Sequence, residues 1–466
     1  MKLPAGPKLP SLLQTLRIIA DPTGFLDTCA AEYGDTFTLR VLGVKSPPVV
    51  FFSDPDAIQA IFTTLADQFE FGKVTHVFRP LTGDQSLIMQ EGVRHQKQRQ
   101  LLMPALHGES LYRCGNLICD ITKTQTANWS PDALIPVQDA MLDISLEVIL
   151  QVVFGLQPGQ RLLHLKSLLH TLLERVNSPF YSVQFFLPPL QQDWGKSSPW
   201  GGFLHLRQQI DQLLYAEIAE RRQLANSPSE DSERTDILSM LLSARDAADQ
   251  PLSDQELRDQ LMTLLLLGHE TTASGLTWAL YWLHQNPETM TQLRAELEGL
   301  GHHPHPLELA QQPYLNAVCK EALRVYPIAL ISQPRRVKQT VRLAGFEFAP
   351  GAILIPCIYL AHRRTQTYPE STQFRPERFL DSKLSPYEYL PFGGGSRSCI
   401  GAALAMFEMK LILATLLRQF AFRPVQPIRP ITRPARRGIT FVPPGSFQLR
   451  VIRAHSVAAL AANHAG

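Results

Sequence analysis

The stretch PFGGGSRSCIGAALAMFEMKLILATLL, from Pro391 to Leu417, places one cysteine between a glycine-rich loop and a strongly predicted helix. Cys399 stands at the start of that helix, where free backbone N–H groups and the helix dipole favour an anion. The glycines let the backbone pass close to a flat, bulky group, and Arg397 adds a nearby cation. A phosphate loop requires G-x-x-x-x-G-K-[ST] or G-x-G-x-x-G after a strand, and neither pattern fits. A buried core thiol and a metal-binding thiolate remain, and the glycine-rich setting favours the thiolate.

Length and charge exclude several classes of function. The chain has 466 residues, enough for two or three domains or for one large enzyme domain. Lysine plus arginine total 44 and aspartate plus glutamate total 42, so the net charge of +2 gives no reason to expect a nucleic-acid partner. The apolar runs are far shorter than the roughly 20 residues that span a bilayer. We therefore expect a cytoplasmic protein with no transmembrane anchor.

The other cysteines do not suggest a second metal site. None of the six cysteines forms a C-x-x-C pair, so neither a zinc site nor a disulfide framework is indicated. Five of them are expected to be small buried hydrophobic residues: Cys29, Cys114, Cys119, Cys319 and Cys357.

The hydrophobic pattern predicts a mainly α protein with a minor β portion. The runs DTFTLRVLG and PPVVFFS predict an N-terminal hairpin, and the periodicity is mostly helical from about residue 54 to residue 325. The polar segment 225–236 is expected to be a surface loop. After Pro327, the runs VRLAGFEFAP and AILIPCIYL predict short strands, and GITFVPPGSFQLRVI predicts a last hairpin that turns at Pro443, Pro444 and Gly445.

The β portion is assembled from both ends of the chain, which favours one domain over residues 1–466. Within it, residues 1 to about 30 form a proline-rich lead-in, and residues from about 455 to 466 are expected to be a frayed tail.

Phe392, Gly395, Arg397, Cys399 and Gly401 match the signature F-x-x-G-x-R-x-C-x-G, and the chain resembles the cytochrome P-450 family of haem-thiolate monooxygenases. The resemblance implies the cytochrome P-450 fold, with haem b between a distal oxygen-activation helix and a proximal cysteine loop. Cys399 would be the axial ligand of the haem iron, Phe392 would pack beside the sulfur, and Arg397 would bind a propionate. Thiolate ligation favours O–O cleavage.

A second motif agrees with this resemblance. In KEALRVYP, Glu321 and Arg324 lie three residues apart on one helix face, and FRPERF supplies Arg378 as a third member. A surface ion pair of this kind contributes little, but the apolar neighbours predict a buried pair that needs further partners. The arrangement resembles the E-x-x-R motif of the family and its partner arginine, whose role is structural.

The stretch LMTLLLLGHETTASGLTWAL resembles the distal helix of the family. Gly268 would leave room above the haem, and Glu270 and Thr271 would deliver protons during oxygen activation. A threonine hydroxyl in a helix can instead donate to the carbonyl one turn earlier. Leu267 departs from the usual alanine or glycine and is expected to narrow the pocket or to steer the substrate, while His269 is expected to be a packed or surface histidine rather than a ligand.

Three further cations match positions that bind haem propionates in the family. His95 and Arg99 lie four residues apart on one helical face, which without the resemblance would indicate a solvated basic surface. Arg336 is preferred over the adjacent Arg335 as the third cation. Neutralising two carboxylates in a cleft with arginine and histidine is favourable.

The expected reaction is hydroxylation of a small hydrophobic substrate with one oxygen atom from O2. The resemblance favours a long-chain fatty acid or a terpenoid, with electrons from an external ferredoxin or flavodoxin attracted by residues such as Lys97 and Lys410. The substrate walls are expected to come from residues 71–89, 176–200, 264–272 and 328–331 and from the last hairpin.

Two other functions stay open at this stage. A peroxide-driven peroxygenase or a haem-thiolate isomerase would need no reductase, although the Glu270 and Thr271 pair argues against both. A non-enzymatic haem-based sensor or ligand-binding protein is disfavoured because the sequence has no recognisable signalling or DNA-binding segment.

Overall fold

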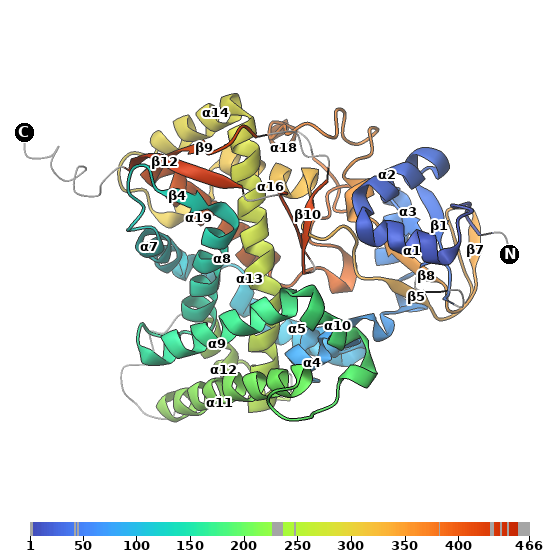
Figure 1. Ribbon diagram of the computed structural model, residues 1–466, viewed down its shortest axis with the longest axis horizontal. Helices are drawn as coiled ribbons and strands as arrows, with labels where there is room; N and C mark the ends of the chain where they lie inside the picture. The colour runs from blue at the N-terminus through green and yellow to red at the C-terminus, as the bar shows by residue number, and fades with distance from the viewer. Residues whose placement is uncertain are drawn as a thin grey trace, which may run out of the picture.

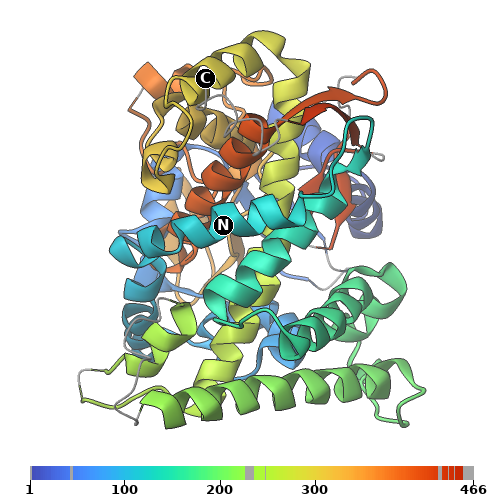
Figure 2. The ribbon, with the colours of Figure 1, turned by 90° about the vertical axis from the view of Figure 1, so that its left-hand side faces the viewer.

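Helix α13 (Asp254–Gln285) runs through the middle of the computed structural model (Figures 1 and 2), which describes residues 3–41, 43, 46–225, 236–246, 248–381, 383–428, 433–438, 440–444 and 447–454. The helix begins at a capping box in which Ser253 and Glu256 satisfy each other's free backbone N–H groups. Most of its residues from Leu257 onward are buried, because other helices cover nearly its whole circumference. A helix that is apolar almost all round is expected at the centre of a large protein.

Helices surround α13 on most sides, as the periodicity of residues 54–325 predicted. Helix α8 packs along α13, α11 crosses near its N-terminal end (Figure 2), and α16 and α19 contact it on the side of the cysteine loop. The other helices are α1 (Ser11–Ala20), α2 (Pro22–Tyr33), α3 (Pro55–Phe62), α4 (Arg79–Thr82), α5 (Gly92–Leu102), α6 (Glu109–Arg113), α7 (Gly115–Gln125), α8 (Val137–Val148), α9 (Gln160–Asn177), α10 (Pro179–Phe186), α11 (Pro199–Ala225), α12 (Ile237–Ser243), α14 (Pro287–Glu298), α15 (Pro306–Ala310), α16 (Pro313–Val325), α17 (Ile358–Ala361), α18 (Arg378–Asp381) and α19 (Ala402–Gln419).

The largest sheet joins the two ends of the chain, in the order β1-β2-β8-β5-β3. Its strands are β1 (Thr36–Leu39), β2 (Val49–Phe52), β3 (Phe69–Glu70), β5 (Arg335–Val337) and β8 (Ile353–Pro356). Strands β1 and β2 are antiparallel, which confirms the N-terminal hairpin. The run AILIPCIYL is only partly a strand, because β8 ends at Pro356, which has no N–H to donate, and α17 begins two residues later.

The prediction of a last hairpin is wrong. Strand β11 (Thr440–Val442) pairs with β10 (Ala435–Arg437), whereas β12 (Gln448–Ala454) pairs with β9 (Phe420–Pro424) and with β4 (Leu134–Pro136). Pro443 and Pro444 have no N–H groups to continue β11, so the chain leaves that ribbon and joins another sheet. The run VRLAGFEFAP, predicted as one short strand, contains two strands, β6 (Val341–Leu343) and β7 (Phe346–Phe348), which pair as an antiparallel hairpin.

Two other sequence predictions concern segments outside the described residues. Most of the predicted surface loop, residues 226–235, and the predicted tail from residue 455 belong to this part of the chain. Among the residues that are described, no helix combines the length and hydrophobicity that crossing a membrane requires.

Candidate functional site

The loop before α19 presents its cysteine differently from every other cysteine of the chain. Cys399 is exposed, whereas the other five cysteines are buried, as the sequence predicted for them. The backbone N–H of Cys399 donates to the carbonyl oxygen of Phe392 over 2.9 Å, which closes the glycine-rich loop. Burial raises the pKa of the Cys399 thiol, while the backbone N–H of Gly401 and the charge of Arg99 act in the opposite direction. The thiol is thus accessible, densely surrounded and faced by groups that favour an anion.

Helix α5 brings its two predicted cations beside this loop. Arg99 donates to the carbonyl oxygen of Ser398 over 2.8 Å and to its hydroxyl oxygen over 3.0 Å. His95 is buried, and burial together with the charges of Arg397 and Arg99 lowers its pKa to about 4. His95 is therefore neutral at pH 7 and can donate one hydrogen bond from its ring.

The expected third cation has to be corrected from Arg336 to Arg335. In β5 the side chain of Arg335 is buried, whereas that of Arg336 is 57% exposed and pairs with Glu70 at the surface over 3.0 Å. Side chains alternate along a strand, so the two arginines point to opposite faces of the sheet. Arg335, not Arg336, lies near enough to Arg397 for the two charges to act on each other.

Arg335 and Arg397 share one aromatic partner, and neither forms an ion pair with an acidic residue in the part of the chain that the structure describes. Their guanidinium carbons lie 4.4 and 4.1 Å from the ring centre of Phe71. Burial and the charge of Arg397 lower the pKa of Arg335 to about 9, and burial and Arg99 lower that of Arg397 to about 10, against the opposing charge of Glu91. Among the described residues, the buried Nε of Arg397 has no hydrogen-bond partner.

These features fit haem. Buried cations without matching anions are unfavourable, so a ligand bearing two carboxylates would stabilise this cluster. An accessible cysteine beside the same cluster supplies the soft ligand that an iron porphyrin takes from such a loop.

One face of α13 is less buried than the rest of the helix. Leu264, Leu267, Gly268 and Thr271 are only partly buried, and their spacing of three and four residues places them on one stripe. Leu267, which departs from the usual alanine or glycine of the motif, belongs to this stripe. The hydroxyl of Thr271 donates to the carbonyl oxygen of Leu267 over 2.6 Å. This is the backbone contact that the sequence left open as an alternative, and it leaves the lone pairs of the hydroxyl free to accept a proton donor.

Glu270 leaves the helix on a different side from Thr271. Its carboxylate lies near Arg437 and Thr440, and burial raises its pKa to about 6. His269 is buried against α8, with Nε2 3.0 Å from the carbonyl oxygen of Leu142. The prediction that His269 is a packed residue is thus confirmed.

On the cysteine side, the predicted structural network is present. The guanidinium of Arg324 donates to both carboxylate oxygens of Glu321 over 2.7 and 2.9 Å, and Arg378 donates to the same carboxylate over 3.0 Å. Arg324 also donates to the carbonyl oxygens of three residues in the segment that leads to the cysteine loop: His362, Ser371 and Gln373. The network therefore fixes the main chain of that segment.

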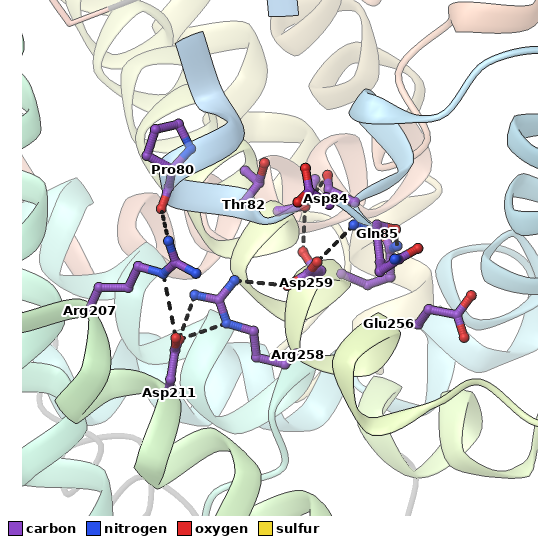
Figure 3. Close-up of polar contacts among 12 residues, drawn as sticks. Pro80, Thr82, Asp84, Gln85, Arg207, Asp211, Glu256, Arg258 and Asp259 are labelled. Atoms are coloured by element: carbon purple, nitrogen blue, oxygen red, sulfur yellow. Dashed lines mark hydrogen bonds and ion pairs between the residues drawn. The ribbon is translucent and has the colours of Figure 1, made fainter. Parts of the chain in front are cut away.

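A second network, shown in Figure 3, lies where α4, α11 and the start of α13 meet. Arg258 donates to Asp211 over 2.7 Å and to Asp259 over 2.9 Å. Arg207 donates to the carbonyl oxygen of Pro80 over 2.9 Å. These residues line a cleft of about 320 Å³.

The second network anchors the segment that was expected to form one substrate wall. Asp259 accepts from the backbone N–H of Gln85 over 2.8 Å, and Gln260 donates to the carbonyl oxygen of Gln85 over 2.8 Å. The same segment continues to Gln90, whose carbonyl oxygen accepts from Arg397 over 2.6 Å. The start of α13 is thus connected through this segment to the cation cluster.

Two relevant arginines were missed or misplaced from the sequence. Val337 is an apolar residue that is buried, and residues two apart on a strand share a face. This alternation could have indicated that Arg335, rather than Arg336, points inward. No local signal pointed to Arg437, which is 167 positions from Glu270 and meets it only through tertiary packing.

Comparisons with known proteins agree with the site. A family model described as Cytochrome P450 matches residues 4–451. The chain is 35% identical over 454 residues to cytochrome P450 135A1 of Mycobacterium tuberculosis, covering 97% of this chain and 95% of that protein. It is 34% identical over 461 residues to cytochrome P450 135B1 of Mycobacterium bovis, covering 98% and 93%.

Solved structures show the same likeness. The retinoic acid-bound cyanobacterial CYP120A1 has a TM-score of 0.78 at 26% identity and covers 97% of this chain and 99% of its own. The cytochrome P450DA heme domain, at 22% identity, has a TM-score of 0.82 and covers 97% and 98%, which supports the fold.

Proposed function

The chain belongs to the cytochrome P450 family, and we propose that it hydroxylates a long-chain fatty acid or a terpenoid with one oxygen atom of O2. The family assigns it to the haem-thiolate monooxygenases, with haem b as the cofactor. The observation that carries the proposal is the accessible thiol of Cys399 beside a cluster of one buried arginine, Arg335, and two half-buried arginines, Arg99 and Arg397.

Different residues of the chain would bind different parts of the cofactor. In this proposal Cys399 would ligate the haem iron through its sulfur, and the backbone N–H of Gly401 favours the negatively charged form of that sulfur. The propionates would be held by three arginines around the loop, Arg99, Arg335 and Arg397, and by the neutral His95 as a hydrogen-bond donor. The bound haem supplies the chemistry that activates O2 for insertion into a C–H bond.

Helix α13 provides the residues of the distal face. The Thr271 hydroxyl would accept a hydrogen bond from a water molecule, because its own proton is donated to the carbonyl oxygen of Leu267. Glu270 resupplies protons from its side of the helix, where a pKa of about 6 suits proton exchange near neutral pH. The side chain of Leu267 excludes water and narrows the space above the porphyrin.

The substrate class is supported by two observations. Four large apolar side chains are exposed on α10 and on the segment after it, within the expected wall: Val183, Leu187, Leu190 and Trp194. The structural relative CYP120A1 binds retinoic acid, which is an isoprenoid carboxylic acid. A flexible apolar substrate is consistent with both the exposed apolar side chains and the ligand of this relative.

The electron donor is proposed to be an external ferredoxin or flavodoxin that docks on the cysteine side. Lys97 is exposed there and can attract an acidic partner. Lys410 is a weaker candidate than the sequence suggested, because its ammonium group already donates to the carbonyl oxygen of Ala310 over 2.6 Å.

The test is turnover under ¹⁸O₂ with ferredoxin, its reductase and NADPH, using fatty acids and retinoids that displace the water ligand in the haem absorption spectrum. One ¹⁸O atom in each product molecule is expected. Product formed with peroxide alone, and not with O2 and the reductase, would instead establish a peroxygenase. Saturable binding without turnover of any bound compound would indicate a ligand-binding protein.

A further inference from the structure

The carboxylate of Glu270 is held by three other elements of the chain. The Nε atom of Arg437, in β10, lies 3.5 Å from Oε1 of Glu270, and the hydroxyl of Thr440, in β11, lies at the same distance. Asn177, at the end of α9, also hydrogen bonds to this carboxylate. Residues far apart in the sequence therefore meet at one carboxyl group.

The turn between β10 and β11 is shaped for this contact. Gly438 has a positive φ of 52°, a conformation that residues with a side chain rarely adopt. A Cβ at Gly438 would lie 3.3 Å from Oε2 of Glu270 and would collide with the side-chain oxygen of Asn177. The backbone thus approaches Glu270 as closely as a glycine allows.

Arg437 connects this buried carboxylate to the surface. The side chain of Glu270 is 8% exposed, whereas that of Arg437 is 37% exposed. The Nη1 atom of Arg437 lies 3.9 Å from Oδ1 of Asp139, whose side chain is 67% exposed. Around Glu270, Arg437 is the charged group that acts on it, Asn177 and Thr440 are neutral partners, and the neighbouring His269 has its pKa lowered to about 4.

We propose that Arg437 is a positioning residue for proton delivery. It holds the Glu270 carboxylate toward the β10 and β11 ribbon, where the carboxylate takes up protons from the surface before it serves the distal face. This inference rests on the proposed function, because Glu270 needs to be reloaded only if it gives up protons in each turnover.

The charge of Arg437 has a definite effect on Glu270. Burial raises the pKa of Glu270 to about 6, and Arg437, Asn177 and Thr440 pull it in the other direction. Removing the arginine charge therefore raises the pKa further, by roughly one pH unit for a pair at this separation that is partly reached by solvent. The protonated carboxyl would then persist to a higher pH.

The experiment is an infrared titration of the holoenzyme. The C=O stretch of a protonated carboxyl group is assigned to Glu270 by its absence in Glu270→Gln and is followed with pH in the wild type and in Arg437→Gln. The midpoint is expected to rise by roughly one pH unit in Arg437→Gln and to return most of the way in Arg437→Lys. Arg423→Gln, which removes an exposed arginine of β9, is the matched control and should leave the midpoint unchanged.

The same variants are compared in turnover. Arg437→Gln should move the alkaline limb of coupled product formation to higher pH, and the double variant with Glu270→Gln should behave as Glu270→Gln alone. An infrared midpoint equal to that of the wild type in both Arg437 variants overturns the inference. If instead Glu270→Gln keeps the wild-type turnover profile, the proposed role of Glu270 fails, and the infrared midpoints still decide whether Arg437 controls its proton.

Discussion

Two arginine networks of similar composition lie on opposite sides of the site and differ in their access to water. Glu321 and Arg324 on the cysteine side are both 0% exposed, and the arginine also binds three backbone carbonyls. Arg258 is also buried, with its side chain 2% exposed, but its partner Asp211 is 19% exposed at the cleft, and its contacts are with side chains. The first network has no substitute partner in solvent, whereas water in the cleft can reach the Asp211 carboxylate of the second. Burial, rather than the number of ion pairs, therefore decides how much each contributes.

The largest effect is expected from the first network. Arg324→Ala would leave the Glu321 carboxylate buried beside only Arg378 and would deprive three carbonyls of a donor. We expect a loss of about 3–5 kcal/mol in the free energy of unfolding, measured by urea denaturation of the holoenzyme. A loss below about 1 kcal/mol would remove the distinction between the two networks.

Glu408 is a buried carboxylate with no cation partner among the described residues, and it tests the same effect of burial. Glu408 in α19 is buried, accepts from Ser145 and has its pKa raised to about 8, chiefly by burial. The folded protein then keeps a proton that the unfolded chain releases above its ordinary pKa of 4.5, so stability falls as the pH rises from about 4.5 to 8. Glu408→Gln should flatten this dependence and add on the order of 2 kcal/mol at pH 9. Urea titrations at pH 6 and 9 measure it, with the exposed Glu288→Gln as the control.

A smaller effect is expected at the cleft. Asp259→Asn keeps the size of the side chain but removes the negative charge beside Arg258, which retains Asp211. We expect a loss of about 1 kcal/mol and faster amide hydrogen exchange at Gln85, whose N–H donates to Asp259. Unchanged exchange at Gln85 would show that Gln260 alone anchors the segment.

The smallest effect belongs to the exposed pairs. Arg79→Ala removes an ion pair with Asp84, and Arg336→Ala removes the pair with Glu70; both arginines are more than half exposed. Each variant should change the free energy of unfolding by less than about 0.5 kcal/mol.

Arg335→Ala differs from Arg336→Ala by one position and should instead accelerate the loss of haem to a haem-free acceptor protein, because the side chain of Arg335 is buried near Arg397.

Sequence reasoning succeeded where function or packing requires a fixed local spacing. Three features could be recognised within a single segment of the sequence: the three-residue separation of Glu321 and Arg324, the glycine-rich loop before Cys399 and the apolar length of α13. Most of the mainly helical fold and its N-terminal hairpin were therefore predictable.

Sequence reasoning failed where the structure depends on contacts between two distant segments. The choice of Arg336 over Arg335 did not take into account which side chains of the short strand β5 point inward. The prediction of a last hairpin did not take into account that β12 pairs with β9 and β4. The proximity of Arg437 to Glu270 depends on tertiary packing that no local pattern contains.

The 32 residues of α13 form one uninterrupted rod of about 48 Å. At one end it carries Arg258 and Asp259, in its middle the stripe that includes Gly268, and near its other end Trp282, which stacks on Phe374. Because the helix is continuous between these points, a displacement of its first turn at the cleft would be transmitted along its axis to the stripe that includes Gly268.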